Sequence, residues 1–288
     1  MSFLTPPPLR QGDRVAVVAP SGPFDRPSFE KGLELISRRY TPVFTERIFS
    51  AHRYLAGTDE GRLQEIQAAL DDDSIKAVFA ARGGYGSARL LAGLKLTRPK
   101  HLVGFSDFTS IHWAAQKLGW RSIHAPVLTQ LGKQSPEVIE RLFAILEGRA
   151  VSPLTGSRTI TAGVAEGPLL GGNLSVFTRL IGTPWWNDLR GSVLLIEDVG
   201  ERPYRLDRMW THLELAGLFE GVKGIVFGEF TGCDEKDYSS ADVLDELARK
   251  LGIPCAAGFL IGHGEVNESV ALGAPVRLDA SAQTLSFP

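Results

Sequence analysis

The chain has 288 residues, 43% of them hydrophobic, which is enough to bury a sizeable core in one large domain or two modest ones. Its 31 Lys and Arg residues nearly balance its 33 Asp and Glu residues, so charge gives no reason to expect nucleic acid or an anionic membrane as a partner. Its two cysteines, Cys233 and Cys255, form no CxxC pair. This argues against a disulfide framework or a cysteine zinc site and fits a reducing compartment.

The sequence shows neither a membrane span nor a secretion signal. No stretch approaches 18 uninterrupted apolar residues, the length that a membrane-spanning helix needs. Residues 1–8 (MSFLTPPP) have neither the basic region nor the apolar region of a signal peptide. We therefore expect a cytoplasmic protein.

In the first half of the chain, short β-branched runs alternate with stretches of helical periodicity. The predicted strands, in chain order, cover residues 14–19, 41–45, 76–80 and 101–105. Predicted helices follow residue 22, Thr58 or Asp59, the glycine turn at 83–86, and Asp107, and a last one opens at Ser135-Pro136. This alternation predicts an α/β fold with a flavodoxin- or Rossmann-like parallel sheet that helices cover on both faces.

The composition changes after residue 150. Residues 151–166 are rich in Ser, Thr, Pro and Gly and lack a helical period, so we expect a linker between an N-terminal domain, residues 1–150, and a C-terminal domain, residues 167–288. Beyond it we expect strands at 192–197 and 222–227, helices around 206–213 and 241–251, and a terminal hairpin. The second domain is thus predicted to be a smaller α/β domain with a mixed sheet.

Several common active-site motifs are missing. The turn Gly83-Gly84-Tyr85-Gly86 lacks the third glycine of a dinucleotide fingerprint, and no GxxxxGK[ST], HExxH or GxSxG occurs. His263-Gly264-Glu265 starts like a deaminase signature, but no PCxxC follows it. These absences argue against dinucleotide, P-loop and zinc enzymes.

Ser106 follows the predicted strand at 101–105, where the chain turns directly into a helix. In open α/β sheets, ligands bind beyond the carboxyl ends of strands. Backbone N–H groups at a helix start can stabilise an oxyanion beside the Ser106 hydroxyl. On this segment alone, the better interpretation is that Ser106 or Asp107 is simply the helix N-cap.

Two further polar junctions lie in the second half. Glu197 and Asp198 follow an apolar strand, with Glu201 close behind; for Asp198 and Glu201 a solvated turn is the preferred interpretation. His263 is flanked by Gly262 and Gly264, which should leave its ring accessible, although a surface-loop histidine is the alternative. With Ser106, these residues supply a nucleophile, an orienting acid and a general base.

Motifs at these junctions and elsewhere occur in a recognisable order. They are GDRV at 12–15, APSG at 19–22, ARGGYG at 81–86, GFSD at 104–107, GGNL at 171–174, IED at 196–198, PYRLDR at 203–208 and GHG at 262–264. Over nearly its whole length the sequence resembles the LD-carboxypeptidase family, which includes the microcin C immunity peptidases.

The resemblance implies a serine peptidase in which Ser106 is the nucleophile, His263 the general base and Glu197 the group that orients this base. It also implies an oxyanion hole built from the backbone N–H groups of Gly84 (or Gly83) and Asp107. No metal or other cofactor is needed for this chemistry, and the family suggests a homodimer.

The family's usual substrate is a murein tetrapeptide whose terminal D-alanine follows an L-configured centre. The free carboxylate of such a small peptide needs a cation or a cluster of N–H groups to bind it. We predict substrate contacts from Arg82, Tyr204 and Arg208, with surface or interdomain salt bridges as the alternative role for the arginines. The sequence leaves two other functions open: a peptidyl-nucleotide hydrolase of the microcin C type, and a non-catalytic ligand-binding protein.

Overall fold

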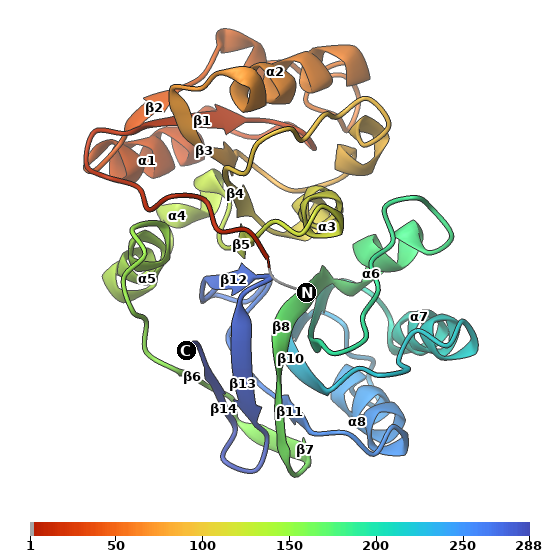
Figure 1. The fold of residues 1–288 in the computed structure, drawn as a ribbon. Helices are drawn as coiled ribbons and strands as arrows, with labels where there is room; N and C mark the ends of the chain where they lie inside the picture. The colour runs from red at the N-terminus through yellow and green to blue at the C-terminus, as the bar shows by residue number, and fades with distance from the viewer. Residues whose placement is uncertain (1–2) are drawn as a thin grey trace. The chain divides into compact units, whose positions relative to one another are not determined.

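The computed structural model describes residues 3–288, which form two compact units (Figure 1). The first unit extends to Arg149 and also includes Glu268–Ala271. The second unit comprises Ala150–Asn267 and Leu272–Pro288. None of the helices in the described part of the chain has the length and apolar character that a membrane crossing requires.

The first unit is built on a six-stranded sheet with the order β12-β5-β4-β3-β1-β2. Its strands are β1 (Arg14–Val18), β2 (Thr41–Val43), β3 (Ile75–Ala80), β4 (His101–Gly104), β5 (Ser122–His124) and β12 (Val270–Leu272). Strands β1 to β5 pair in parallel. The helices are α1 (Arg26–Ser37), α2 (Asp59–Asp71), α3 (Thr109–Lys117), α4 (Leu128–Leu131) and α5 (Pro136–Leu146), with 3-10 turns η1 (Glu46–Phe49), η2 (Ser87–Leu90) and η3 (Ser106–Phe108).

Local signals in the sequence explain most of these elements. The four apolar residues 15–18 of β1 are fully buried, as expected for a strand inside a parallel sheet with helices α1 and α2 on opposite faces (Figure 1). Helix α2 starts where Thr58 accepts a hydrogen bond from the N–H of Gly61, and α5 starts where Ser135 caps the N–H of Val138. The helix predicted after the glycine turn is only the 3-10 turn η2, and a turn at residues 91–93 follows it.

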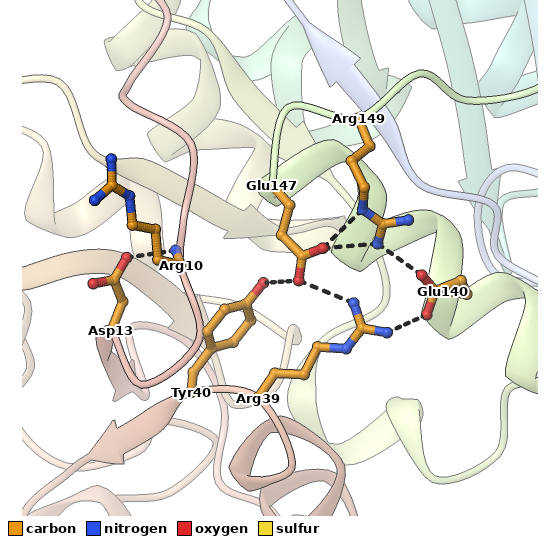
Figure 2. Close-up of polar contacts among 7 residues, drawn as sticks. All are labelled: Arg10, Asp13, Arg39, Tyr40, Glu140, Glu147 and Arg149. Atoms are coloured by element: carbon orange, nitrogen blue, oxygen red, sulfur yellow. Dashed lines mark hydrogen bonds and ion pairs between the residues drawn. The ribbon is translucent and has the colours of Figure 1, made fainter.

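An ion-pair network joins the end of helix α1 to the end of helix α5 (Figure 2). The Glu147 carboxylate accepts hydrogen bonds from Arg39 (2.9 Å), Tyr40 (3.2 Å) and Arg149 (2.8 Å). Glu140 accepts from the same two arginines. Burial opposes ionisation of Glu147, but the arginines outweigh it and leave the pKa of Glu147 below its ordinary value. The network fastens the end of α5 to the end of α1.

The second unit contains an eight-stranded mixed sheet with the order β6-β14-β13-β8-β9-β10-β11-β7. The strands are β6 (Leu154–Thr155), β7 (Arg158–Thr161), β8 (Val164–Asn173), β9 (Val193–Val199), β10 (Gly224–Thr231), β11 (Cys255–Ala257), β13 (Pro275–Asp279) and β14 (Thr284–Ser286). Strands β8 to β11 are parallel, whereas β7, β13 and β14 pair antiparallel with their neighbours. Helices α6 (Leu174–Phe177), α7 (Pro203–Leu215) and α8 (Ser240–Lys250) and the turn η4 (Thr178–Leu180) complete it. The α/β fold with one mainly parallel sheet and one mixed sheet is thus confirmed.

The structure differs from the expected organisation in two places. Residues 151–166, expected to be a linker, contain β6, β7 and the start of β8. Thr159 and Thr161 are good strand formers at a sheet edge, and their polarity concealed that strand. Residues 268–271, expected in the C-terminal domain, belong to the first unit, where β12 forms the edge of its sheet. A strand of three residues leaves too short a pattern to be recognised in the sequence.

Candidate active site

Ser106 lies at a strained turn in the first unit. One residue, Phe105, separates it from the end of β4, and it opens the turn η3. Its φ of 60° falls in the left-handed region, which residues other than glycine rarely adopt. Such strain persists only where the surrounding structure imposes it, and it is concentrated at functional sites. A serine on a sharp turn between a strand and a helix presents its hydroxyl at the end of the sheet.

Two glycines allow the chain to pack closely around Ser106. A methyl group at Gly83 would lie 2.9 Å from the Ser106 Oγ, so the glycine turn after β3 touches the serine directly. A methyl group at Gly104 would lie 2.9 Å from the Cβ of Ala80 on the neighbouring strand. Gly84 has a φ of 115° and packs on Gly22, whose N–H donates to the Gly83 carbonyl at 3.1 Å. The turns after β1, β3 and β4 therefore meet at the carboxyl edge of the parallel sheet, where ligands bind in this fold.

Asp107, the residue after the serine, is 4% exposed and links these turns. Its carboxylate accepts hydrogen bonds from the Ser21 hydroxyl (2.6 Å) and from the Ser87 backbone N–H (2.7 Å). The Ser87 hydroxyl in turn donates to the Asp107 carbonyl at 2.5 Å. Ser21 follows β1 and Ser87 follows the glycine turn, so one side chain connects all three segments.

The second unit contains a buried carboxylate–imidazole pair. Glu197, near the end of β9, is fully buried, and its Oε2 lies 2.7 Å from the Nδ1 of His263. When Nδ1 donates this hydrogen bond, the neutral ring has its acceptor lone pair on Nε2. A carboxylate in this position fixes the tautomer of the histidine and stabilises the imidazolium that forms when the ring takes up a proton.

The glycines around His263 are explained by close packing rather than by exposure of the ring. A methyl group at Gly262, whose φ is 130°, would lie 2.8 Å from the Glu197 Oε2. A methyl group at Gly264 would overlap the carboxylate of Glu229 on β10. The His263 side chain is 13% exposed, so its ring is partly buried and only part of it is accessible. Glycines on both sides let two carboxylates approach the histidine loop.

Glu229 holds this loop through its backbone and its side chain. Its N–H donates to the Ile261 carbonyl at 2.9 Å, and its carboxylate accepts a hydrogen bond from the Gly264 N–H. Burial raises the pKa of Glu229 above its ordinary value. Nothing in the sequence singles out Glu229, because its role depends on the pairing of β10 with β9.

Negative charge dominates the surroundings of the imidazole. Burial lowers the pKa of His263, but the carboxylates of Glu197, Asp198 and Glu229 outweigh burial and leave this pKa above its ordinary value. Burial, and then the charge of Glu197, raise the pKa of Asp198 to about 6. The ring is thus surrounded by groups that favour its protonated form.

Asp198 is not part of a solvated turn, as the local sequence suggested. It is 1% exposed and accepts hydrogen bonds from the Asn173 side chain (3.1 Å), the Ser175 N–H (2.8 Å) and the Val199 N–H (2.9 Å). The parallel register of β8 and β9 sets Asn173 beside Glu197, so the start of α6 supplies the donors that Asp198 needs. The motif at 171–174 contains Asn173, but its spacing from Asp198 gives no sign of this contact.

The predicted substrate contacts lie on two separate elements. Arg82 is exposed in the glycine turn of the first unit and donates to the Pro23 carbonyl. Tyr204 and Arg208 lie one turn apart on α7, where the guanidinium carbon is 5.3 Å from the centre of the Tyr204 ring, which is 47% exposed. All three therefore retain polar groups at the surface of their own units.

Comparison with known proteins identifies the family. Residues 15–125 match the family model of the LD-carboxypeptidase N-terminal domain, and residues 166–278 match that of the LD-carboxypeptidase C-terminal domain. The protein belongs to the LD-carboxypeptidase family. The first match contains Ser106, and the second contains Glu197 and His263.

Relatives of this LD-carboxypeptidase family member align over almost its full length. It is 40% identical to a putative carboxypeptidase of Synechocystis, over 99% of this chain and 98% of the relative. It is 32% identical to the murein tetrapeptide carboxypeptidase of Pseudomonas aeruginosa, over 93% of this chain and 94% of the relative. These names support a peptidase. A solved structure of MccF in complex with glutamyl sulfamoyl guanosine has the same fold, with a TM-score of 0.86 and 22% identity over 98% of this chain and 97% of MccF.

Proposed function

We propose that this protein is a serine carboxypeptidase that hydrolyses the L,D-peptide bond before the terminal D-alanine of murein tetrapeptides. The observation that carries the proposal is the 2.7 Å contact between the buried Glu197 carboxylate and the His263 imidazole. The strained Ser106 turn beside the glycine turn supports it, as does similarity to a murein tetrapeptide carboxypeptidase. The proposal includes a cytoplasmic location and a homodimer.

In the proposed reaction, the Ser106 Oγ attacks the scissile carbonyl carbon while His263 takes its proton at Nε2. Glu197 stabilises the resulting imidazolium through Nδ1. The carbonyl oxygen becomes an oxyanion and accepts hydrogen bonds from the backbone N–H groups of Gly84 and Asp107. Losing one such donor costs roughly 3–4 kcal/mol of transition-state stabilisation.

The intermediate then collapses, the C–N bond breaks, and the imidazolium returns its proton to the amine of D-alanine, which leaves. Water attacks the acyl-enzyme with His263 again acting as base, and the shortened peptide is released. Arg82, Tyr204 and Arg208 are the proposed contacts to the substrate, with an arginine pairing with its terminal carboxylate.

The test is mass spectrometry of a sugar-free murein tetrapeptide incubated with the wild-type protein, with Ser106→Ala and with Ser110→Ala. Ser110 is a matched control, because its hydroxyl is buried in α3 and has no hydrogen-bond partner among the described residues. We expect the wild type and Ser110→Ala to release D-alanine, and Ser106→Ala to lose about 10⁶-fold in kcat. Equal release by Ser106→Ala would contradict the assignment of the nucleophile.

Absence of release from all three proteins would remove the murein assignment. The next substrate would be an aminoacyl sulfamoyl nucleoside, the kind of ligand bound in the MccF structure. Cleavage of that compound by the wild type alone would indicate a peptidyl-nucleotide hydrolase. Binding of either compound without cleavage would indicate a non-catalytic ligand-binding protein.

A further inference from the structure

The carboxylate of Asp107 has no role in the chemistry described so far, in which only its backbone N–H takes part. It is nevertheless 4% exposed and forms no ion pair among the described residues. Burying a carboxylate is unfavourable unless hydrogen bonds replace its water. Here the donors are neutral groups, the hydroxyl of Ser21 and the N–H of Ser87, at 2.6 and 2.7 Å. Hydrogen bonds to a charged acceptor are short and about twice as strong as neutral ones.

Both donors bind the same carboxylate oxygen, Oδ2. That oxygen therefore joins the segment after β1 to the start of η2. Because Asp107 directly follows Ser106 in the chain, both segments are also tied to the turn that carries the proposed nucleophile. Ser87 also donates a second hydrogen bond to Asp107, from its hydroxyl to the Asp107 carbonyl at 2.5 Å. Asp107 and Ser87 are thus fixed to one another through both side chains.

This connection spans the two places from which the proposed oxyanion donors come. One donor is the N–H of Asp107 itself. The other is the N–H of Gly84, three residues before Ser87. It belongs to the glycine turn, in which Gly83 packs against Ser106. The two N–H groups must be held in place to within a fraction of an ångström, because hydrogen bonds to the oxyanion weaken steeply with distance and angle. Glycines at 83, 84 and 86 make the turn adaptable, so something outside it must set its position.

We propose that the Asp107 carboxylate is a positioning group that sets the geometry of the oxyanion hole by holding Ser87, and with it the glycine turn, against the nucleophile turn. This inference rests on the proposed function. It accounts together for the side chains of Ser21, Ser87 and Asp107, which come from three separate segments and take no direct part in the proposed reaction. The hole acts in the transition state, so loss of the carboxylate lowers kcat and leaves KM nearly unchanged.

The test compares Asp107→Ala with Asp107→Asn. One amide oxygen of Asn can accept both hydrogen bonds that Oδ2 accepts, whereas Ala accepts neither. We expect Asp107→Ala to lower kcat 10²- to 10³-fold, the effect of losing one oxyanion donor, with KM within threefold. We expect Asp107→Asn to recover all but about tenfold of kcat. The affinity for a peptide boronate, which mimics the tetrahedral intermediate, should fall in parallel with kcat.

Two controls separate positioning from folding. Asp245→Ala removes an Asp that is buried to 8% exposure and pairs with Arg158 in the second unit, so it should change stability and leave kcat unchanged. If Asp107→Ala does not fold, Ser21→Ala removes a single donor to the carboxylate and should lower kcat about tenfold. An unchanged kcat in the folded Asp107 or Ser21 variants would overturn the inference, as would a loss of kcat matched by an equal loss in Asp245→Ala.

A fluorophosphonate probe distinguishes failure of this inference from failure of the proposed function. The probe phosphonylates an activated serine through an oxyanion-stabilised step and needs no natural substrate. Slower labelling of Ser106 in Asp107→Ala, with no D-alanine release by the wild type, would support the positioning role and refute the substrate. Equal labelling rates in an active wild type and the variant would refute the positioning role alone. No labelling of the wild type would refute both.

Discussion

The Ser106 turn of the first unit and the His263 loop of the second both depend on buried carboxylates, but the partners of those carboxylates differ. Asp107 receives hydrogen bonds from a hydroxyl and a backbone N–H, which are neutral and do not titrate near pH 7. Glu197 contacts an imidazole, which does titrate there. A carboxylate of the first kind fixes backbone positions, and one of the second kind sets the charge of a ring. Substitutions at the two places should therefore change different quantities.

The largest effect in the second unit is expected for Glu197→Gln. An amide can present its NH₂ group to Nδ1 of His263 and so favour the wrong tautomer, which puts the proton on Nε2. We expect kcat for D-alanine release to fall about 10⁴-fold, measured in the steady state. Glu166→Gln, at an exposed ion pair with Arg277, is the control and should keep wild-type kcat. A Glu197→Gln enzyme with more than a tenth of wild-type kcat would show that the contact does not orient the base.

Gly262→Ala tests the close packing of the histidine loop. Ala at 262 would have a φ of 130°, which costs more than about 1 kcal/mol. Its methyl group would also press on the Glu197 carboxylate, which costs roughly another 1–3 kcal/mol. We expect a lower free energy of unfolding in urea and a 10- to 100-fold loss in kcat. Gly252→Ala is the control for a positive φ without close contact, since its φ is 65° and nothing lies within 4 Å of the added methyl group. If both variants lose the same free energy of unfolding and neither loses kcat, the close packing of residue 262 on Glu197 contributes neither to stability nor to catalysis.

The smallest effect is expected for Glu229→Gln, and it appears as a shift in pH dependence. The general base works only when neutral, so kcat/KM falls as the pH drops below the pKa of His263. The charge of Glu229 helps to hold that pKa above its ordinary value, and its removal should move the acid limb of the pH profile to lower pH. The plateau should stay within threefold of wild type. Asp107→Asn should lower the plateau and leave the limb in place, so a shift of the limb in that variant would contradict the comparison.

Much of this arrangement could be predicted from the sequence, and what could not depends on tertiary pairing. Capping residues such as Ser135 and Thr58 act within three residues of the helix start, so their signal is local. Glu197 and His263 lie 66 positions apart, and only family resemblance brought them together; their catalytic roles stay predictions. The sequence contains no pattern that points to Glu229. It favours a solvated turn for Asp198, which is wrong, because the side chain of Asn173 that donates to Asp198 comes from a neighbouring strand.

Strand β12 has a consequence for how the protein is synthesised. Residues 268–271 belong to the first unit, so strand β5 lacks its outer neighbour until the ribosome has made these residues, more than 140 positions later. Until then β5 is an open sheet edge, and open edges pair with other chains. A fragment that ends at Arg149 would keep this edge permanently, although its sequence includes every other strand of that sheet. The sheet of the first unit can therefore be completed only after the intervening residues of the second unit have been made.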